Sequence, residues 1–163
     1  MKKELSEKGL LHKAAAYCSK SEHCTSDVRL KLLSWGASKE VISSILSYLI
    51  EERYVDESRY ANAFVKDKYR FNRWGVVKIK MALRQKKLPN EIIEQALELI
   101  DKETNIENLL EIIKTKRRTI HDIDYQKIKG KLFRFGISRG FESQSVLQTI
   151  SKILKNEDIE DLE

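Results

Sequence analysis

The chain has 163 residues, of which 34% are charged, and its formal net charge is +6. Two cysteines are too few for a disulfide framework, and no apolar run approaches the roughly 18 residues that a membrane span requires. The composition therefore predicts a soluble, cytoplasmic protein without a signal peptide or membrane contact, and the positive charge favours a polyanion or an acidic protein surface as its partner.

The first third of the chain predicts three helices. The first covers 10–21, and the second covers 26–35 with Thr25 as its N-cap, because a threonine oxygen can accept a backbone N–H that a helix start leaves unpaired. Gly36 can adopt the left-handed conformation that often ends helices. Ser38 then caps a third helix, in which apolar residues recur along one face.

The middle and last thirds of the chain repeat this plan. Asp56 is expected to cap a helix, Gly75 separates that helix from the next, and Pro89 lies in the first turn of a third, where proline is tolerated. The acidic residues after Asn156 are expected to form a frayed tail. The last three helices are predicted over 106–116, 128–139 and 143–154.

Similar residues return at a spacing of about fifty positions. The turn at Gly36 is followed 51 residues later by Lys87 and a further 53 residues later by Gly140. Self-similarity of this length is typical of stacked supersecondary units. The predicted fold class is therefore all-α, with three tandem three-helix (helix-turn-helix-like) repeats in an elongated, curved array; a single globular bundle is the alternative. The predicted segments are an N-terminal segment 1–9, repeats 10–54, 55–100 and 101–155, and an acidic tail 156–163.

The sequence lacks the motifs that would indicate catalysis. It has no GxxxxGK[ST] or GxGxxG phosphate loop, no GxSxG nucleophile elbow and no carboxylates at metal-ligand spacing. Cys18, His23 and Cys24 invite a metal-binding interpretation, but zinc normally takes three or four closely spaced ligands, so we interpret the cysteines as small buried hydrophobes. We expect no enzyme activity, no cofactor, no metal and no small-molecule substrate.

Basic residues concentrate in the middle repeat. Nine Lys and Arg residues and one acidic residue, Asp67, lie between positions 66 and 87, a local excess of +8. Their spacing places Lys66, Arg70 and Arg73 on one helix face, and Lys80, Arg84 and Lys87 on one face of the next. A second basic stretch runs from Lys114 to Arg139. The predicted partner- or DNA-binding residues are Lys66, Arg70, Arg73, Lys78, Lys80, Arg84, Lys86, Lys87, Lys127, Lys131, Arg134 and Arg139.

Two interpretations of this charge stay open. The basic faces can bind phosphate or carboxylate groups of a partner, or they can be solvated helix exteriors without a partner. Tyr69, Phe71 and Trp74 lie among the charges, where an aromatic ring can stack on a nucleic-acid base. For Trp74 a core position between two helices is the favoured interpretation.

Three segments in the order of the repeats carry a family pattern. They are Arg53–Ala61 with Phe64 and Val65 after it, Trp74–Lys86, and Ser138–Phe141. Together they resemble the RecX regulators of the bacterial recombinase RecA, over about residues 10–154. Two positions depart from the family pattern. Lys87 stands where Gly is usual, so the turn is made without the easiest left-handed residue, and Ser138 replaces the first Arg of an RRGF turn.

The resemblance implies a fold, a partner and a role. It implies three tandem three-helix repeats, no cofactor, and binding to RecA and its filament on single-stranded DNA. Such binding would modulate, and mainly inhibit, recombinase, ATPase and coprotease activity in DNA repair, recombination and the SOS response. The alternative from charge alone is a sequence-nonspecific nucleic-acid-binding protein that acts independently of RecA.

Overall fold

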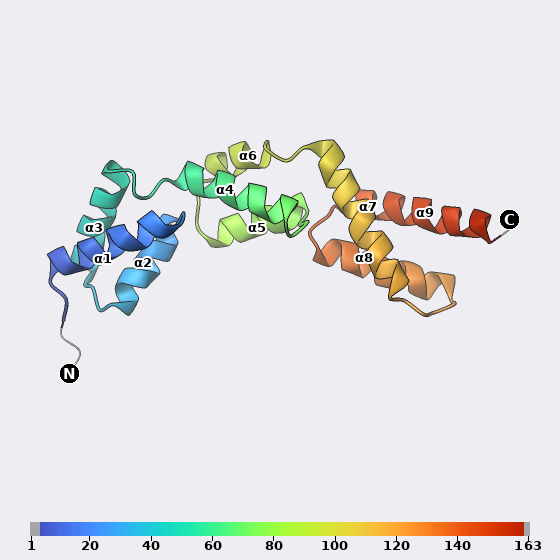
Figure 1. The fold of residues 1–163 in the computed structure, drawn as a ribbon, viewed down its shortest axis with the longest axis horizontal. Coiled ribbons are helices and arrows are strands. Elements are labelled where there is room, and N and C mark those ends of the chain that lie inside the picture. Colours follow the sequence, from blue (N-terminus) through green and yellow to red (C-terminus); the bar gives the residue numbers. More distant parts are fainter. Residues whose placement is uncertain (1–3, 162–163) are drawn as a thin grey trace. The chain divides into compact units, whose positions relative to one another are not determined.

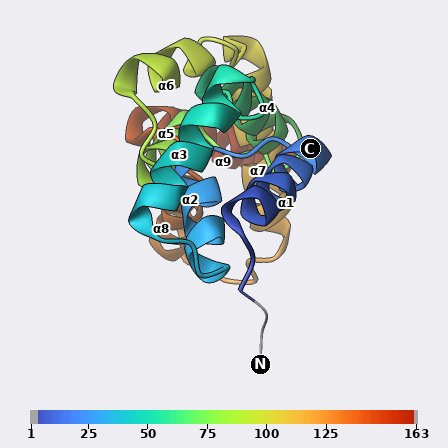
Figure 2. The same cartoon turned by 90° about the vertical axis from the view of Figure 1, so that its left-hand side faces the viewer.

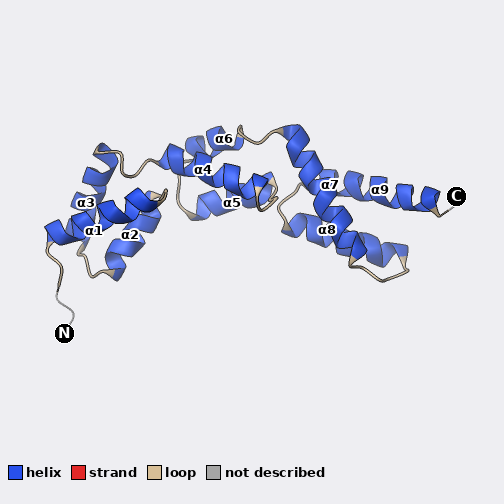
Figure 3. Ribbon diagram, viewed as in Figure 1, coloured by secondary structure: helices blue, strands red, loops and turns tan. Residues whose placement is uncertain are grey.

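The computed structural model describes residues 4–161, and within this range all regular structure is helical (Figures 1 and 3). The nine helices of these residues form three consecutive groups of three, which confirms the all-α, three-triplet prediction. An elongated, curved arrangement of the triplets stays a prediction. The helices are α1 (Glu7–Lys20), α2 (Thr25–Ser34), α3 (Lys39–Glu51), α4 (Glu57–Arg70), α5 (Val76–Gln85), α6 (Asn90–Leu97), α7 (Lys102–Arg118), α8 (Tyr125–Ser138) and α9 (Ser143–Glu160).

The helices belong to two compact units, and the division passes through the middle triplet. The first unit contains the residues up to Phe64 together with Leu83–Ala96. The second contains Val65–Ala82 together with the residues from Leu97 on. Each unit is therefore larger than one triplet and includes part of α4 and part of α5. The repeat boundaries predicted from the sequence stay a prediction.

The first unit is centred on the α1–α3 bundle, whose helices surround one apolar core (Figure 2). Ala14, Val28, Leu32 and Leu49 are fully buried in it. They come from all three helices at the spacing that a single buried face requires, as the sequence pattern predicts. Burial of this apolar surface is the main stabilising contribution to such a bundle.

The second unit has its own core, where α7 packs on α8 and α9. Leu109, Ile113, Leu132 and Ile150 are at most 2% exposed there. Gly136 allows α8 and α9 to approach closely, because a Cβ at this position would lie 2.7 Å from a side-chain carbon of Val146. The pairing of α7 with α8 determines which of their polar side chains meet on the surface.

Most predicted helix starts agree with the structure. The side-chain oxygen of Ser38 accepts the N–H of Val41 at 3.3 Å, and that of Asp56 accepts the N–H of Arg59 at 2.9 Å, which confirms both N-caps. Thr25 is not an N-cap, because Cys24 occupies that position and Thr25 is the first helical residue.

Some helices are longer or begin differently from the prediction. Helix α7 begins at Lys102, four residues before the predicted start at 106, because the Asp101 carboxylate accepts the N–H of Thr104 at 2.8 Å and caps it there. Helix α9 continues to Glu160, so the start of the acidic tail is helical and not frayed. Pro89 directly precedes α6 instead of lying in its first turn.

The three turns of the repeat share one backbone conformation. Gly36, Lys87 and Gly140 have φ values of 85°, 60° and 91°, which lie in the left-handed region. The equivalence at spacings of 51 and 53 residues is therefore a structural repeat as well as a sequence repeat. Lys87 adopts this conformation although it has a Cβ, which costs roughly 1–2 kcal/mol relative to a right-handed residue.

Backbone groups join the middle and last triplets within the second unit. The N–H of Gly75 donates to the carbonyl of Arg139 at 2.8 Å, and the N–H of Val77 donates to the carbonyl of Gly140 at 3.0 Å. The first N–H groups of a helix have no partner within it, so the turn after α8 satisfies the start of α5. We call this contact the second joint.

An equivalent contact, the first joint, lies within the first unit. The hydroxyl of Ser26 donates to the carbonyl of Lys86 at 2.7 Å, and the Lys86 ammonium pairs with Asp27 at 2.7 Å. One carboxylate oxygen of Glu57 also accepts the N–H and the hydroxyl of Thr25, at 2.6 and 2.9 Å. The start of α2 therefore meets the turn after α5 through side chains.

Candidate polyanion-binding groove

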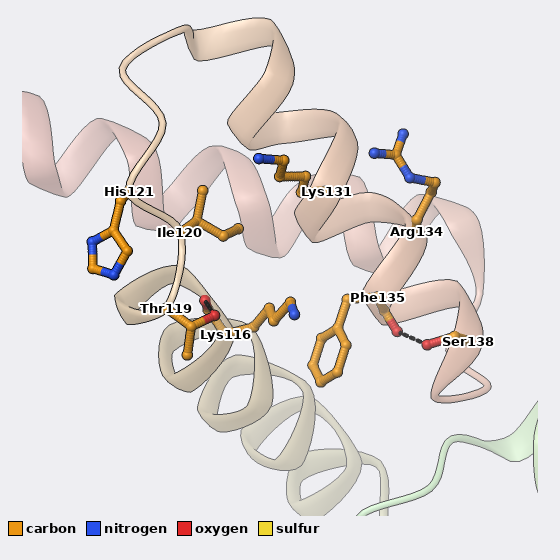
Figure 4. Close-up of a pocket in the computed structure, with 8 residues that line it drawn as sticks. All are labelled: Lys116, Thr119, Ile120, His121, Lys131, Arg134, Phe135 and Ser138. Carbon is orange, nitrogen blue, oxygen red and sulfur yellow. Dashed lines mark hydrogen bonds between the residues drawn. The ribbon is translucent and has the colours of Figure 1, made fainter.

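An open cavity of about 530 Å³ lies between the end of α7 and the second half of α8 (Figure 4). Lys116 reaches it from α7, Lys131 and Arg134 reach it from α8, and His121 from the connecting loop. Phe135 presents its ring beside Lys116, whose ammonium is 5.3 Å from the ring centroid. The remaining lining residues are Thr119, Ile120 and Ser138.

The side chains at the end of α7 divide between two faces. Arg117 turns towards α9, where its guanidinium pairs with Glu157 at 3.1 Å and donates to the carbonyl of Ile120 at 3.0 Å. Lys116 faces α8 instead. Cations in the last helical turn are favoured by the partial negative charge of the unpaired carbonyls, so a basic end to α7 is locally stable as well as available to a ligand.

The cations of this cavity differ in how much of their charge is compensated. Lys131 pairs with Asp122 at 3.4 Å, but its side chain is 46% exposed, so the pair is solvated and weak. Arg134 is exposed and makes no ion pair within residues 4–161. The hydroxyls of Thr119 and Ser138 each donate to a backbone carbonyl at 2.7 Å, so their hydrogens are already used. An anion in this cavity would therefore be held by the cations and not by these hydroxyls.

A second cavity, of about 230 Å³, adjoins the first and shares Lys116, Thr119 and Phe135 with it. It adds two cations, Arg73 from the turn after α4 and Arg139 from the turn after α8. We call the two cavities together the basic groove. Its five Lys and Arg side chains are Arg73, Lys116, Lys131, Arg134 and Arg139.

The backbone carbonyl of Arg139 belongs to the second joint, and its side chain lines the groove. Its guanidinium donates to the carbonyl of Asn72, which fixes the turn that carries Arg73 beside α8. The Nε of Arg139 is buried and has no hydrogen-bond partner among the described residues. A buried N–H of a cation without an acceptor is energetically costly.

The structure brings four predicted site residues together and leaves the others elsewhere. Arg73, Lys131, Arg134 and Arg139 line the groove. Lys66, Arg70, Arg84 and Lys127 are exposed and do not line it. Lys86 is committed to Asp27 in the first joint. Lys78 places its ammonium 4.3 Å from the ring centroid of Trp74. Lys80 lies on α5, outside the groove.

Two predicted helix faces are shorter than expected. Helix α4 ends at Arg70 and α5 ends at Gln85, so Arg73 and Lys87 are turn residues. Both are left-handed, with φ values of 52° and 60°. The face predicted for Lys66 and Arg70 therefore does not continue to Arg73, and a left-handed turn directs the Arg73 side chain into the groove instead.

The aromatic residues of this region have three different environments. Tyr69 is buried, and its hydroxyl accepts a hydrogen bond from Arg70 at 3.2 Å. Trp74 is half-buried beneath the ammonium of Lys78, which supports a packing role. Phe71 is 82% exposed. Of these three rings, Phe71 is the one that is available for stacking.

The groove residues Lys116, Phe135 and His121 were not among the predicted site residues. Lys116 lies in the second basic stretch of the sequence, but nothing local separates it from Lys114 or Arg118. The missing information is the packing of α7 on α8, which places Lys116 near the end of α7 beside Phe135 in the second half of α8.

The thiols are not arranged as ligands or nucleophiles. Cys18 and Cys24 are buried, and this burial raises the pKa of each thiol. A raised pKa lowers the fraction of thiolate, which is the reactive and metal-binding form. The described residues contain no group of three or more His, Cys, Asp or Glu side chains that could hold a metal ion. They also contain no helix that is long and apolar enough to cross a membrane.

The fold and the groove define an all-α protein of tandem helix triplets with a basic surface on its last triplet. Residues 56–97 match the family model for RecX, second three-helix domain. Regulatory protein RecX of Prosthecochloris aestuarii is 30% identical over 146 residues, which cover 90% of this chain and 94% of that protein. The chain belongs to the RecX family.

Other relatives agree in family and in fold. Regulatory protein RecX of Clostridium botulinum (strain Alaska E43 / Type E3) is 34% identical over 132 residues, or 80% of this chain, and the match spans 61% of that longer relative. The crystal structure of RecX from Lactobacillus salivarius has a TM-score of 0.76 at 23% identity and covers 90% of this chain and 95% of its own. A crystal structure of regulatory protein RecX has a TM-score of 0.78 at 24% identity and covers 92% and 79%.

Proposed function

We propose that this chain binds RecA and the RecA filament on single-stranded DNA, and that binding mainly inhibits recombinase, ATPase and coprotease activity. Membership of the RecX family, whose curated relatives are named regulatory proteins, is the observation that carries the proposal. The basic groove supports it physically, because both a DNA strand and an acidic protein surface are attracted to clustered cations.

The proposed activity requires no chemistry from this chain. A regulator of a filament acts by binding one state of the filament more tightly than another. The resulting shift of the equilibrium between the two states cannot exceed this difference in binding free energy. Inhibition follows if the chain stabilises a filament state that exchanges strands or turns over ATP slowly. No cofactor is part of the proposal.

The test is a titration of the protein into RecA with single-stranded DNA and ATP. We expect inhibition of DNA-dependent ATPase and strand exchange at concentrations well below that of RecA, because a filament regulator need not match its target one to one. Inhibition that appears only when enough protein is present to cover the DNA would contradict the proposal and favour a DNA-coating protein that is independent of RecA.

Charge reversal tests whether basic residues carry this effect. Replacing Arg70, Arg73 and Arg84 together by Glu changes the net charge by six and alters exposed positions only. We expect loss of inhibition with unchanged helicity. Its control is the reversal of Lys39, Lys152 and Lys155, which are also exposed and are not among the predicted partner- or DNA-binding residues. Equal inhibition by the two triple variants would show that the predicted basic faces are solvated exteriors without a partner.

A further inference from the structure

Two exposed positions of the second helix in each triplet share one chemistry. They lie six and three residues before the left-handed turn residues Gly36, Lys87 and Gly140. All six side chains are exposed, and each belongs to a large apolar residue or to an arginine. The residues at the first position are Leu30, Met81 and Arg134, and those at the second position are Leu33, Arg84 and Ile137.

This recurrence is not expected of a solvated helix exterior. The outer face of a surface helix normally carries charged and polar side chains of both signs. A single exposed apolar residue needs no explanation, but exposed apolar residues at equivalent positions of a repeat indicate an interaction surface. Each compact unit shows the pattern by itself, with Leu30 and Leu33 in the first unit and Met81 and Ile137 in the second.

The second joint brings two of these helices together within the second unit. The carbonyl of Gly140 accepts the N–H of Val77 at 3.0 Å, and the N–H of Gly140 donates to the carbonyl of Ile137 at 2.9 Å. Val77 is 44% exposed, Met81 one turn further along α5 is 56% exposed, and Ile137 is 39% exposed. We call Val77, Met81 and Ile137 together the joint patch.

The charge on the two helices of the joint patch has one sign. Helix α5 contains three Lys or Arg residues and α8 contains four, and neither helix contains an Asp or Glu. Arg134, which is exposed, lies three residues before Ile137 on α8. A second copy of this chain would place cations against cations, which is unfavourable. A partner with carboxylates around its own apolar surface is complementary to this charge.

The side chains of the joint patch favour a protein over a nucleic acid as this partner. Single strands are bound by cations together with aromatic rings that stack on the bases, and Val77, Met81 and Ile137 carry no ring. Protein interfaces bury apolar side chains at their centre behind a polar rim, and they are enriched in Met and Arg. Met81 and Arg134 are the residue types that such an interface uses.

From these observations we infer that the joint patch is the docking surface for a protein partner whose own surface is apolar and surrounded by carboxylates. Val77, Met81 and Ile137 are buried at the centre of this contact, and Arg134 pairs with a carboxylate at its edge. The inference rests on the proposed function, in which the protein partner is RecA. The patch is separate from the basic groove, which none of its three residues lines.

The test is a titration of RecA, without DNA, into the fluorescently labelled full chain, followed by anisotropy. The triple variant Val77→Thr, Met81→Gln and Ile137→Thr makes the patch polar and leaves the net charge unchanged. We expect RecA to bind at least about tenfold more weakly, because truncated residues at the centre of an interface account for most of its affinity. Met81→Gln alone changes the most exposed of the three residues and should weaken binding in the same direction.

The matched control is the triple variant Ile106→Thr, Leu147→Gln and Ile159→Thr. These three residues are exposed apolar residues of the same unit and do not belong to the patch. The control should bind RecA as the unmodified chain does. Circular dichroism should give the same helicity for both triple variants, and their affinity for a labelled oligothymidylate should equal that of the unmodified chain.

Three results would decide against the inference. Equal RecA affinity of the patch and control variants, both still inhibiting RecA, would overturn it and leave the proposed function intact. Loss of oligothymidylate binding by the patch variant with RecA binding retained would assign the patch to nucleic acid and would also overturn it. An unmodified chain that neither binds nor inhibits RecA would instead reject the proposed function and, with it, RecA as the partner of the patch.

Discussion

Gly140 is the residue whose replacement tests the second joint most directly. It has a φ of 91°, and a Cβ at this position would lie 2.2 Å from the Cβ of Lys78 and 2.6 Å from its backbone nitrogen. Both obstacles are at or near the backbone of α5, so a side-chain rotation cannot relieve them. Gly140→Ala therefore forces the turn after α8 away from the start of α5.

The magnitude follows from a comparison with Gly36→Ala. Gly36 has a nearly identical φ of 85°, but nothing lies within 4 Å of its added Cβ. Gly36→Ala is destabilised only by the left-handed conformation, by roughly 1–2 kcal/mol. Gly140→Ala is destabilised by the same amount and, in addition, by about 1–3 kcal/mol of overpacking. The difference between the two variants measures the close approach at the joint.

Urea unfolding followed by tryptophan fluorescence can separate the two units. The chain contains two tryptophans, and Trp35 belongs to the first unit while Trp74 belongs to the second. Trp35→Phe and Trp74→Phe backgrounds thus report one unit each. We expect Gly140→Ala to lower the unfolding midpoint of the Trp74 signal, and Gly36→Ala to lower that of the Trp35 signal by less. Equal losses in the two variants would refute the close backbone approach at the joint.

Three further predictions concern the turn, the pH dependence and the shape. Lys87→Gly should raise the free energy of unfolding by about 0.5–1 kcal/mol, because relief of left-handed strain exceeds the added chain entropy; a loss of stability in urea unfolding would contradict this. Burial raises the pKa of the Tyr60 hydroxyl above its ordinary value of 10.0, so the folded state retains a proton that the unfolded chain releases. The contribution of this group to the free energy of unfolding is complete below pH 10 and falls as the pH rises further. The Tyr60→Phe variant should therefore lose less stability between pH 9 and 11 than the unmodified chain. An equal loss in the two proteins would exclude Tyr60 as a cause. Small-angle scattering should give a radius of gyration of about 20 Å, where a compact chain of this length would give roughly 15 Å, and the compact value would refute the extended array.

Local rules explain which parts of the fold could be predicted. Ser38 and Asp56 act as N-caps because their short side chains reach backbone N–H groups three residues on, whatever surrounds them. The left-handed turns at Gly36 and Gly140 follow from the absence of a Cβ. Thr25 has the same capping chemistry, yet its hydroxyl donates to Glu57, which lies 32 residues away in the chain. A prediction from neighbouring residues alone is wrong where a residue far away in the chain binds the side chain that would otherwise cap the helix.

The groove could be predicted only in part. The basic stretches are visible in the sequence, but helix spacing assigned Arg73 to a face of α4 that ends at Arg70. Its true position depends on a left-handed turn at a residue with a Cβ, for which the sequence gives no signal. Lys116 and Phe135 meet through the packing of α7 on α8. Sequence periodicity predicts each helix but not which positions of two helices face each other.

Both joints hold the start of the second helix of one triplet against the turn after the second helix of the next triplet, but the contacting groups differ. In the second joint the contacts are between backbone groups, and Gly75 and Gly140 leave the room that they need, since a Cβ on Gly75 would lie 2.3 Å from the Gly140 carbonyl oxygen. In the first joint the equivalent turn residue is Lys87, and side chains of Ser26 and Lys86 make the contacts instead.

Because the two joints use different groups, they should respond differently to salt and to pH. The Lys86–Asp27 pair has side chains that are 39% and 22% exposed, so salt screens part of its attraction. The hydrogen bond that the Lys86 ammonium donates to the Asp27 carboxylate raises the pKa of Lys86, and the contribution of this pair to stability is lost as the pH rises above the ordinary lysine value of 10.5. Backbone hydrogen bonds of the second joint carry no net charge and do not titrate. Salt and alkaline pH should therefore weaken the first joint while the second joint, which positions Arg73 and Arg139 at the groove, is retained.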